Sequence, residues 1–236
     1  MRNYAPIHRT MNAVIYYSNT GESQKIAEAL AQYTQYALLD LTNVTQHAFD
    51  NAMLVFPVHC QNIPVTVKAF LKNLTATNLA VIATYGKMSF GNVLFEVQKL
   101  WRGNIVAAAY VPTKHSYLED DSFADVDKLN VLADKLCVPT PIKVPRFHKN
   151  LFANFFPAGR SRAGVKLYAT DSCNGCNKCA EVCNNNAITC GKPNGKCIRC
   201  LKCVRHCPQH ALVFSLRLPM RRYLKRTNNN RLLIYV

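Results

Sequence analysis

Apolar runs alternate with amphipathic segments along the first half of the chain. Continuous apolar stretches rich in β-branched residues predict buried strands, and apolar residues at helical spacing predict the helices between them. The predicted strands cover residues 11–17, 36–41, 52–58, 79–85 and 105–111, and the predicted helices cover residues 22–33, 64–74, 91–101 and 120–136. Strands alternating with helices are typical of parallel sheets. We therefore expect an α/β three-layer sandwich with a parallel five-stranded sheet in the order 2-1-3-4-5.

The alternating pattern ends near Pro145, and the charge changes at the same place. Residues 1–145 hold 12 Lys+Arg and 11 Asp+Glu, whereas residues 146–236 hold 17 Lys+Arg and only 2 acids. This break predicts a domain boundary. The predicted division is a first domain, a linker, a second domain and a basic C-terminal tail, at residues 1–145, 146–165, 166–214 and 215–236.

Aromatic residues gather in the predicted linker region. Residues 147–156 contain four phenylalanines, Phe147, Phe152, Phe155 and Phe156. We interpret this stretch as a short amphipathic helix that docks on one of the two domains rather than as a cofactor-binding element.

Cysteines are concentrated in the second domain, with nine of the 11 between Cys173 and Cys207. The chain has no run of about 18 apolar residues, which a transmembrane helix needs, and its start lacks a secretory signal. We therefore expect a cytoplasmic protein, in which dense, regularly spaced cysteines are metal ligands rather than disulfides.

Two cysteine runs share the spacing C-x2-C-x2-C-x3-C and form an internal repeat with an offset of 24 residues. Three thiolates at this step can surround one iron–sulfur cubane, and the fourth points to the other cluster. Two crossed ligand sets follow. One is Cys173, Cys176, Cys179 and Cys207, and the other is Cys197, Cys200, Cys203 and Cys183.

The alternative for these runs is a pair of zinc ribbons, but zinc sites use pairs of C-x2-C and leave a third cysteine without a role. The segment resembles the bacterial two-cluster ferredoxins, which implies two [4Fe–4S] clusters. It departs from their pattern at Asn184, where proline is usual. Cys190 has no place in either ligand set, and we expect it to be a small buried residue.

A hydroxyl-rich loop follows the first predicted strand. Loop amides, hydroxyls and the start of a helix form a cradle for a phosphate group, although serine and threonine also cap helices without any ligand. The loop resembles the S-x-T-G-x-[ST] loop of flavodoxins, which holds the phosphate of FMN. The resemblance implies a phosphate site at Ser18, Asn19, Thr20, Gly21, Glu22 and Ser23.

Two more loops end strands at the same predicted edge, at residues 57–62 and 84–92. In flavodoxin-like proteins such loops flank the flavin ring. The resemblance implies contacts from Pro57, Val58, His59, Asn62, Thr84, Tyr85, Gly86, Gly91 and Asn92. His59 and Tyr85 are the flat side chains available for stacking, or they are ordinary loop residues. Cys60 could lie near the flavin, but a plain half-buried thiol is the simpler interpretation.

Nearly the whole chain resembles the flavodoxin–ferredoxin fusions of anaerobic bacteria and archaea, which implies FMN and two clusters in one chain. We expect an electron-transfer protein that passes electrons between these groups and partner proteins. No acid–base residue is required, so no catalytic residue is assigned. One alternative is a flavin-dependent reductase of a quinone or small molecule, fed by its ferredoxin domain. Another is a redox-sensing or docking protein whose flavodoxin domain lacks flavin.

The basic half predicts acidic partners, namely a ferredoxin, a flavodoxin or a flavoenzyme. Their expected docking surface comprises Lys192, Lys196, Arg199, Lys202 and Arg205. Residues 217–231 could instead contact an anionic membrane, but they show no clean apolar stripe. No recognition motif supports nucleic acid.

Overall fold

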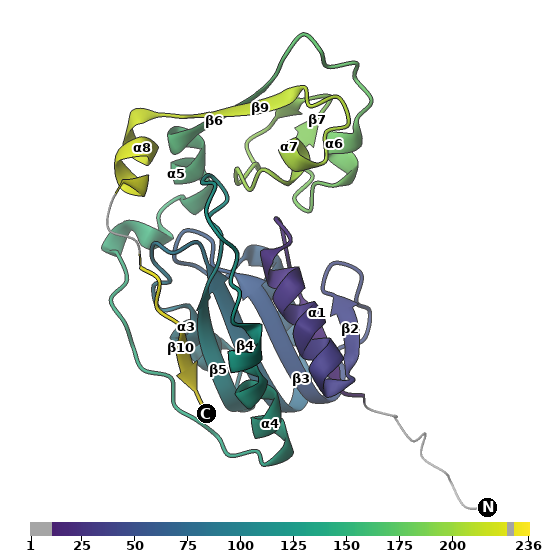
Figure 1. The fold of residues 1–236 in the computed structure, drawn as a ribbon, viewed down its shortest axis with the longest axis vertical. Coiled ribbons are helices and arrows are strands. Elements are labelled where there is room, and N and C mark those ends of the chain that lie inside the picture. The colour runs from purple at the N-terminus through teal and green to yellow at the C-terminus, as the bar shows by residue number, and fades with distance from the viewer. Residues whose placement is uncertain (1–10, 226–228) are drawn as a thin grey trace, which may run out of the picture.

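The structure is a computed structural model that describes residues 11–225 and 229–236. A sheet with helices on both faces forms one end of the molecule (Figure 1). Strands and helices alternate along the chain as the apolar pattern predicts. The elements are β1 (Ala13–Tyr16), α1 (Glu22–Thr34), β2 (Ala37–Asp40), β3 (Ala48–Pro57), α2 (Val65–Asn73), β4 (Thr75–Tyr85), α3 (Val93–Leu100), β5 (Asn104–Pro112) and α4 (Asn130–Cys137).

The strand order is β2-β1-β3-β4-β5-β10, and β1 to β5 are parallel. The predicted order 2-1-3-4-5 is confirmed. The sheet has a sixth strand, because β10 (Leu233–Tyr235) pairs antiparallel with β5 and sets Leu233 opposite Tyr110. The predicted tail, residues 215–236, therefore returns to the first domain. The predicted extents 1–145 and 215–236 also include residues 1–10 and 226–228, which lie outside the described residues.

Each face of the sheet buries its own apolar layer. Along β3, Met53 and Val55 belong to the layer under α1 and α4, whereas Leu54 and Phe56 belong to the layer under α2 and α3. Parallel strands that are covered on both faces show near-continuous apolar runs instead of alternation. This burial fixes the strand ends, and hence the loops at the carboxyl edge, in space.

The helix predicted at residues 120–136 begins later than expected. A 3-10 helix (Val126–Leu129) leads into α4. Asp120 accepts a hydrogen bond from the His115 backbone N–H at 3.0 Å and forms an ion pair with Lys87 at 3.4 Å. Asp120, the first residue of the predicted helix, thus connects loops at the sheet edge instead of starting a helix.

The amphipathic helix expected at residues 147–156 does not form. Phe147 packs edge-on against Phe90, as expected of a docked side chain. A 3-10 helix (Leu151–Asn154) follows, and Phe152, Phe155 and Phe156 are exposed. The prediction is wrong for all of the stretch except Phe147.

A small second domain lies beyond the carboxyl edge of the sheet (Figure 1). Its first and last strands, β6 (Val165–Ala169) and β9 (Leu212–Leu216), pair antiparallel. Between them lie α6 (Lys178–Glu181), the hairpin β7 (Ile188–Thr189) and β8 (Lys192–Pro193), and α7 (Lys202–Arg205). We call residues 165–216 the cluster module.

Two helices flank the cluster module in the chain. α5 (Pro157–Gly164) precedes β6, and α8 (Leu218–Leu224) follows β9 and packs against α5. At this contact a Cβ on Gly164 would lie 2.8 Å from Met220. Among the described residues, no helix has the length and apolarity needed to cross a bilayer.

Candidate functional site

The two cysteine runs fold as a structural repeat. Helices α6 and α7 occupy equivalent places, 24 residues apart. Three pairs of residues at the same offset adopt left-handed backbone angles, a conformation that non-glycine residues take only where a tight loop requires it. The pairs are Gly175 with Arg199, Asn177 with Leu201, and Asn186 with His210.

The first predicted ligand set surrounds one cavity. Cys173, Cys176 and Cys179 line it from the first run, and Cys207 lines it from the end of the second run. The structure therefore brings together the four thiols of the crossed set. Cys190, which was expected to be buried, is exposed at the same cavity.

Backbone N–H groups point at the sulfurs of this set. The Gly191 N–H lies 3.4 Å from Cys179 Sγ. Burial raises the pKa of Cys207, but backbone N–H groups of residues 209–212 lower it by more, and the net pKa lies below the ordinary value. Donors aimed at sulfur favour the thiolate, which is the form that binds iron.

The second predicted set is also assembled. Burial raises the pKa of Cys203 to about 12, and the next causes are the negative charges of Cys200, Cys197 and Cys183. The Ala187 N–H also lies 3.3 Å from Cys183 Sγ. Thiols crowded without a cation resist ionisation, and a bound metal reverses that effect.

The arrangement differs from a zinc site. Among residues 11–225 and 229–236, no three His, Cys, Asp or Glu side chains converge closely enough to hold a single metal ion. A cubane takes each thiolate on a different iron, so its ligands surround a space rather than one point. The donor set and its spread both fit an iron–sulfur cluster.

A second cavity of about 540 Å³ lies at the carboxyl edge of the sheet. This volume is within the usual range of small-molecule sites, about 300–1,000 Å³. Residues from all three predicted flavin loops line it. The expected flavin contacts among them are Asn19, Thr20, Pro57, Val58, His59, Tyr85 and Gly86, and Cys60, Gln61, Met88 and Ser89 of the same loops line it as well.

The predicted phosphate loop is divided between cavity and interior. Ser18 Oγ accepts the Gly21 N–H at 3.0 Å, and Ser23 Oγ lies 2.8 Å from Thr84 Oγ1 in the interior. The hydroxyls of Ser18 and Ser23 and the N–H of Gly21 are therefore already paired within the protein. The buried Asn19 Oδ1 has no hydrogen-bond partner among the described residues, so it is free to meet a donor on a ligand.

Glu22 places a carboxylate in the same loop. It accepts hydrogen bonds from Lys25 at 3.2 Å and from Ser122 at 3.1 Å. Arg205 of the cluster module donates to the Thr20 carbonyl at 3.2 Å and to the Ser116 carbonyl at 3.4 Å. Lys25 thus balances the charge of Glu22, and the Arg205 guanidinium lies beside the backbone of the same loop.

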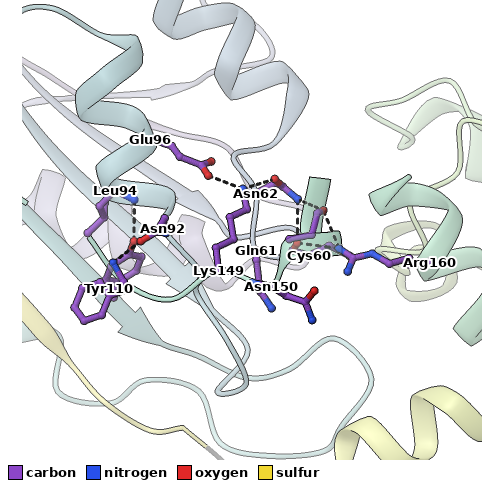
Figure 2. Close-up of polar contacts among 12 residues, drawn as sticks. Cys60, Gln61, Asn62, Asn92, Leu94, Glu96, Tyr110, Lys149, Asn150 and Arg160 are labelled. Atoms are coloured by element: carbon purple, nitrogen blue, oxygen red, sulfur yellow. Dashed lines mark hydrogen bonds and ion pairs between the residues drawn. The ribbon is translucent and has the colours of Figure 1, made fainter. Parts of the chain in front are cut away.

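Asn62, Gly91 and Asn92 do not line the cavity. Figure 2 shows the polar network in which the two asparagines take part. Asn62 donates to the carbonyls of Cys60 at 3.0 Å and Ala153 at 2.8 Å, and Asn92 accepts the Phe147 backbone N–H. These groups hold the chain between α4 and α5 against the first domain.

Two of the lining residues have structural contacts of their own. The Tyr85 hydroxyl donates to the Arg231 carbonyl at 2.7 Å and accepts the Arg231 N–H at 3.0 Å, and burial is the first cause that raises its pKa to about 12. A Cβ on Gly86 would lie 2.6 Å from the His115 ring. Tyr85 therefore anchors the segment before β10, and Gly86 makes room for His115.

Cys60 lies in the cavity wall beside His59. Its Sγ is 3.3 Å from Ser161 Oγ, and its backbone angles are left-handed. Burial raises the pKa of the Cys60 thiol, but the hydrogen bond and charge of His59, the hydroxyl of Ser161 and the charge of Arg160 lower it by more. The thiol is thus more acidic than an ordinary cysteine, which the sequence did not indicate.

The cluster module forms another wall of this cavity. Ile198, Arg199 and Cys200 line it, and the Tyr117 hydroxyl donates to the Arg199 carbonyl at 2.8 Å. Cys200 belongs to the second predicted ligand set. The candidate flavin site and the candidate cluster site therefore share a wall.

Part of the expected basic docking surface is engaged inside the molecule. Arg199 Nε donates to the Val165 carbonyl at 3.1 Å, and Lys202 Nζ donates to Asn184 Oδ1 at 2.9 Å. Arg205 reaches the first domain, as described above. Lys192 and Lys196 are exposed.

Several lining residues escaped the sequence analysis. His115, Ser116 and Tyr117 follow β5, and the rule that ligands bind outside the carboxyl ends of parallel strands could have found them. Others come from α5 and α8, which no motif places at the sheet edge. These are Arg160, Ser161, Ala163, Gly164, Pro219, Met220 and Tyr223.

Comparisons with known proteins agree with this architecture. Residues 194–213 match the family described as 4Fe-4S binding domain. A comparison with curated proteins gave no match. Among solved structures, the chain is similar to a short-chain flavodoxin associated with a bacterial microcompartment, at 14% identity over 55% of this chain and 97% of that chain with a TM-score of 0.39. It is also similar to the Trp repressor binding protein from Bacillus subtilis, at 12% identity over 53% and 94% with a TM-score of 0.33.

Scores this low carry no argument, so the fold assignment rests on the strand order. The order 2-1-3-4-5 is that of flavodoxin-like sheets. The iron–sulfur assignment rests on the cysteine runs and on the match at residues 194–213. The chain thus joins a domain with a flavodoxin-like strand order to a cysteine-rich domain that contains a match to the 4Fe-4S binding domain family.

Proposed function

We propose that the chain is an electron-transfer protein that connects two [4Fe–4S] clusters to one bound FMN. The observation that carries this proposal is the shared wall at the sheet edge. Residues of the predicted flavin loops and Cys200 line one cavity. Electron transfer needs donor and acceptor close together, and both would be held on rigid elements.

In this proposal Cys173, Cys176, Cys179 and Cys207 hold the outer cluster, and Cys183, Cys197, Cys200 and Cys203 hold the inner one. The clusters supply single electrons and FMN exchanges one or two. The chain's own part is to fix the ligands and tune the sulfurs. The N–H groups of Gly191 and Ala187 lie close to Cys179 and Cys183 and stabilise negative charge there.

The flavin part of the proposal rests on position and charge. Asn19 and Thr20 line the cavity, and Arg205 brings a guanidinium to the Thr20 carbonyl. Planar guanidinium groups suit phosphate recognition. Because Arg205 belongs to the cluster module, an FMN phosphate at this loop would be held by both domains.

The two ligand sets differ in exposure, which suggests an order of transfer. Each set has two buried cysteines, and the difference lies in one residue: Cys176 of the outer set is exposed, whereas no cysteine of the inner set is exposed. A partner protein would meet the outer cluster first, and the inner one would stand between it and the flavin. Of the cations expected to form the docking surface, Lys192 and Lys196 are exposed and remain for steering an acidic partner.

Anaerobic purification followed by iron and flavin assay tests the cofactor content. We expect about eight iron atoms and about one FMN per chain, as two cubane sites and one flavin site imply. Intact clusters without flavin would overturn the proposal and favour the flavin-free sensing or docking protein.

A kinetic experiment tests the connection between the sites. FMN is reduced selectively in a flash, and its reoxidation by the clusters is followed by absorbance. We expect Cys200→Ser to slow this step at least tenfold, with Cys137→Ser, at the exposed last residue of α4, as the matched control. Equal rates in both variants would contradict the route.

Faster turnover with a quinone than with any protein acceptor would favour the reductase.

A further inference from the structure

An exposed apolar turn projects between α4 and α5. Four large side chains of this turn are mostly solvent-exposed, namely Leu151 (86%), Phe152 (68%), Phe155 (63%) and Phe156 (81%). The Phe152 and Phe155 rings are neighbours, with centroids 6.3 Å apart. Single exposed apolar residues are ordinary, but a contiguous group of this size marks an interaction site. We call these four residues the apolar turn.

The apolar turn is held in place by polar contacts. Ala153 is fully buried, and its carbonyl accepts hydrogen bonds from Asn62 Nδ2 at 2.8 Å and from Arg160 Nη2 at 2.9 Å. Asn150 caps the 3-10 helix by accepting the Phe152 N–H at 2.9 Å. Figure 2 shows Asn62 and Arg160 in the polar network beside Cys60. The exposure of the phenyl rings is thus a property of a fixed turn.

The same segment shows that burial was available nearby. Phe147 lies four residues before the apolar turn and packs against Phe90 and Tyr110 in the core of the first domain. After Phe147 the next large apolar side chain of the segment, Leu151, is exposed. The apolar turn is therefore convex, and its side chains point outward rather than line a groove.

Positive charge surrounds the apolar turn. Residues 138–170 contain no Asp or Glu. Helix α8 packs against α5, which begins directly after Phe156, and exposes Leu218 (59%) next to Arg217, Arg221 and Arg222. Figure 1 shows α5 and α8 together at one edge of the molecule. Apolar and cationic groups thus lie on one side.

We propose that this side docks on an anionic lipid bilayer, with the apolar turn inserted among the headgroups and the arginines of α8 on the phosphates. Two weak signals, apolar insertion and cationic attraction, together give reversible membrane attachment. A convex tip suits a fluid bilayer, whereas a protein partner would have to offer an apolar pocket with an acidic rim. Residues 217–231 lack an apolar stripe that could insert into the bilayer. In this proposal the apolar turn provides the inserted side chains.

Vesicle flotation of the reconstituted full chain tests the proposal. The probes are phosphatidylcholine vesicles with and without about one third phosphatidylglycerol, the anionic component that cationic side chains recognise. We expect flotation only with the anionic vesicles, weakened by salt because the attraction is screened. Absence of flotation at low salt, or equal flotation with neutral vesicles, would overturn it.

Matched variants separate the two contributions. Phe152→Ser with Phe155→Ser and Phe156→Ser should abolish flotation, and Val138→Ser, which removes a 71% exposed apolar side chain after α4, should not. Arg217→Gln with Arg222→Gln should weaken binding about tenfold or more, since each cation near the surface contributes. Lys68→Gln with Lys72→Gln removes two exposed charges from α2 and should leave binding unchanged.

Folding is checked in every variant by iron content and thermal melting. If Lys68→Gln with Lys72→Gln weakens flotation as much as Arg217→Gln with Arg222→Gln, net charge alone explains binding and the proposal fails. If the phenylalanine variant instead loses an acidic protein partner while wild type ignores anionic vesicles, the surface is a protein interface and the proposal is equally overturned.

Discussion

The two domains are stabilised in different ways. The flavodoxin-like domain buries one apolar layer on each face of its sheet, with Phe56 and Met53 fully inaccessible on opposite sides. The cluster module has one small buried group, in which four of the ten members are cysteines, Cys179, Cys197, Cys203 and Cys207. A domain of this size with so few apolar side chains depends on its metal. We therefore expect the first domain to be stabilised mainly by its apolar core, and the second mainly by metal binding to its cysteines.

Iron removal is the largest perturbation of this contrast. Chelation of the proposed clusters should unfold the cluster module, because structural metal sites contribute on the order of 10 kcal/mol to folding. Amide exchange should become fast in β6 and β9 and stay slow in β3. Hydrogen–deuterium exchange before and after chelation measures both in one sample. Persistent protection of β6 and β9 would mean that the apolar group suffices.

A substitution that creates a cavity in the core of the first domain should destabilise that domain and leave the cluster module intact. Phe56→Ala should lower the free energy of unfolding of the flavodoxin-like domain by about 3–5 kcal/mol, the usual cost of emptying a buried phenyl site. Urea denaturation followed by Trp101, the single tryptophan of the chain, measures it. Iron per chain should not change.

The matched control for Phe56→Ala is Val65→Ala, at a site that is 85% exposed. It should stay within about 0.5 kcal/mol of the parent protein. Loss of iron from the Phe56 variant would show that the module needs the first domain to fold.

The junction between the domains offers a smaller test. Tyr85→Phe removes the hydroxyl that both donates to and accepts from the Arg231 backbone. The Arg231 backbone N–H and carbonyl then lose this partner, which should cost about 1 kcal/mol and loosen β10. Amide exchange at Ile234 reports the change. Tyr33→Phe, which removes an exposed hydroxyl bonded to Asp134, should leave Ile234 unaffected.

The smallest expected effect concerns the shared cavity. Because the pKa of Cys60 is lowered, its thiolate persists to lower pH than that of an ordinary cysteine, and alkylation should be fast near neutral pH. His59→Gln removes a hydrogen bond and a charge that favour the thiolate, so the alkylation profile should move to higher pH.

Mass spectrometry of the Cys60 peptide follows this reaction against pH. A profile that does not move in the His59 variant would assign the lowered pKa to Ser161 and Arg160 instead. Saturation with FMN should protect the thiol if the flavin occupies the same cavity.

The sequence predicted most of the sheet but missed its last strand. Continuous apolar runs identified β1 to β5 and, with the crossover rule, their order. β10 is three residues long and follows a basic stretch, so it is too short to show the apolar pattern of a strand. A signal existed in β5, whose residues 105–112 are all buried. A fully apolar strand cannot stand at an open edge, so a further strand was to be expected.

The candidate site could be predicted where cofactor chemistry fixes the spacing of residues in the sequence. It could not be predicted where tertiary contacts determine which side chains reach the cavity. The crossed cysteine sets follow from a local repeat, and the structure brings each set together, although its role as ligand stays a prediction. Asn62 and Asn92 looked equivalent to Asn19 in sequence. Only the path of residues 147–154 over the first domain turns them away from the cavity.

The return of the chain to β5 has a consequence for biosynthesis. β10 leaves the ribosome after the cluster module, so the first sheet stays one strand short while the module is being made. During that interval β5 presents a bare edge, which invites pairing with other chains. Completion of the flavodoxin-like domain thus waits for the residues that follow the cluster ligands, and a nascent chain stalled before them would be the most aggregation-prone form of the protein.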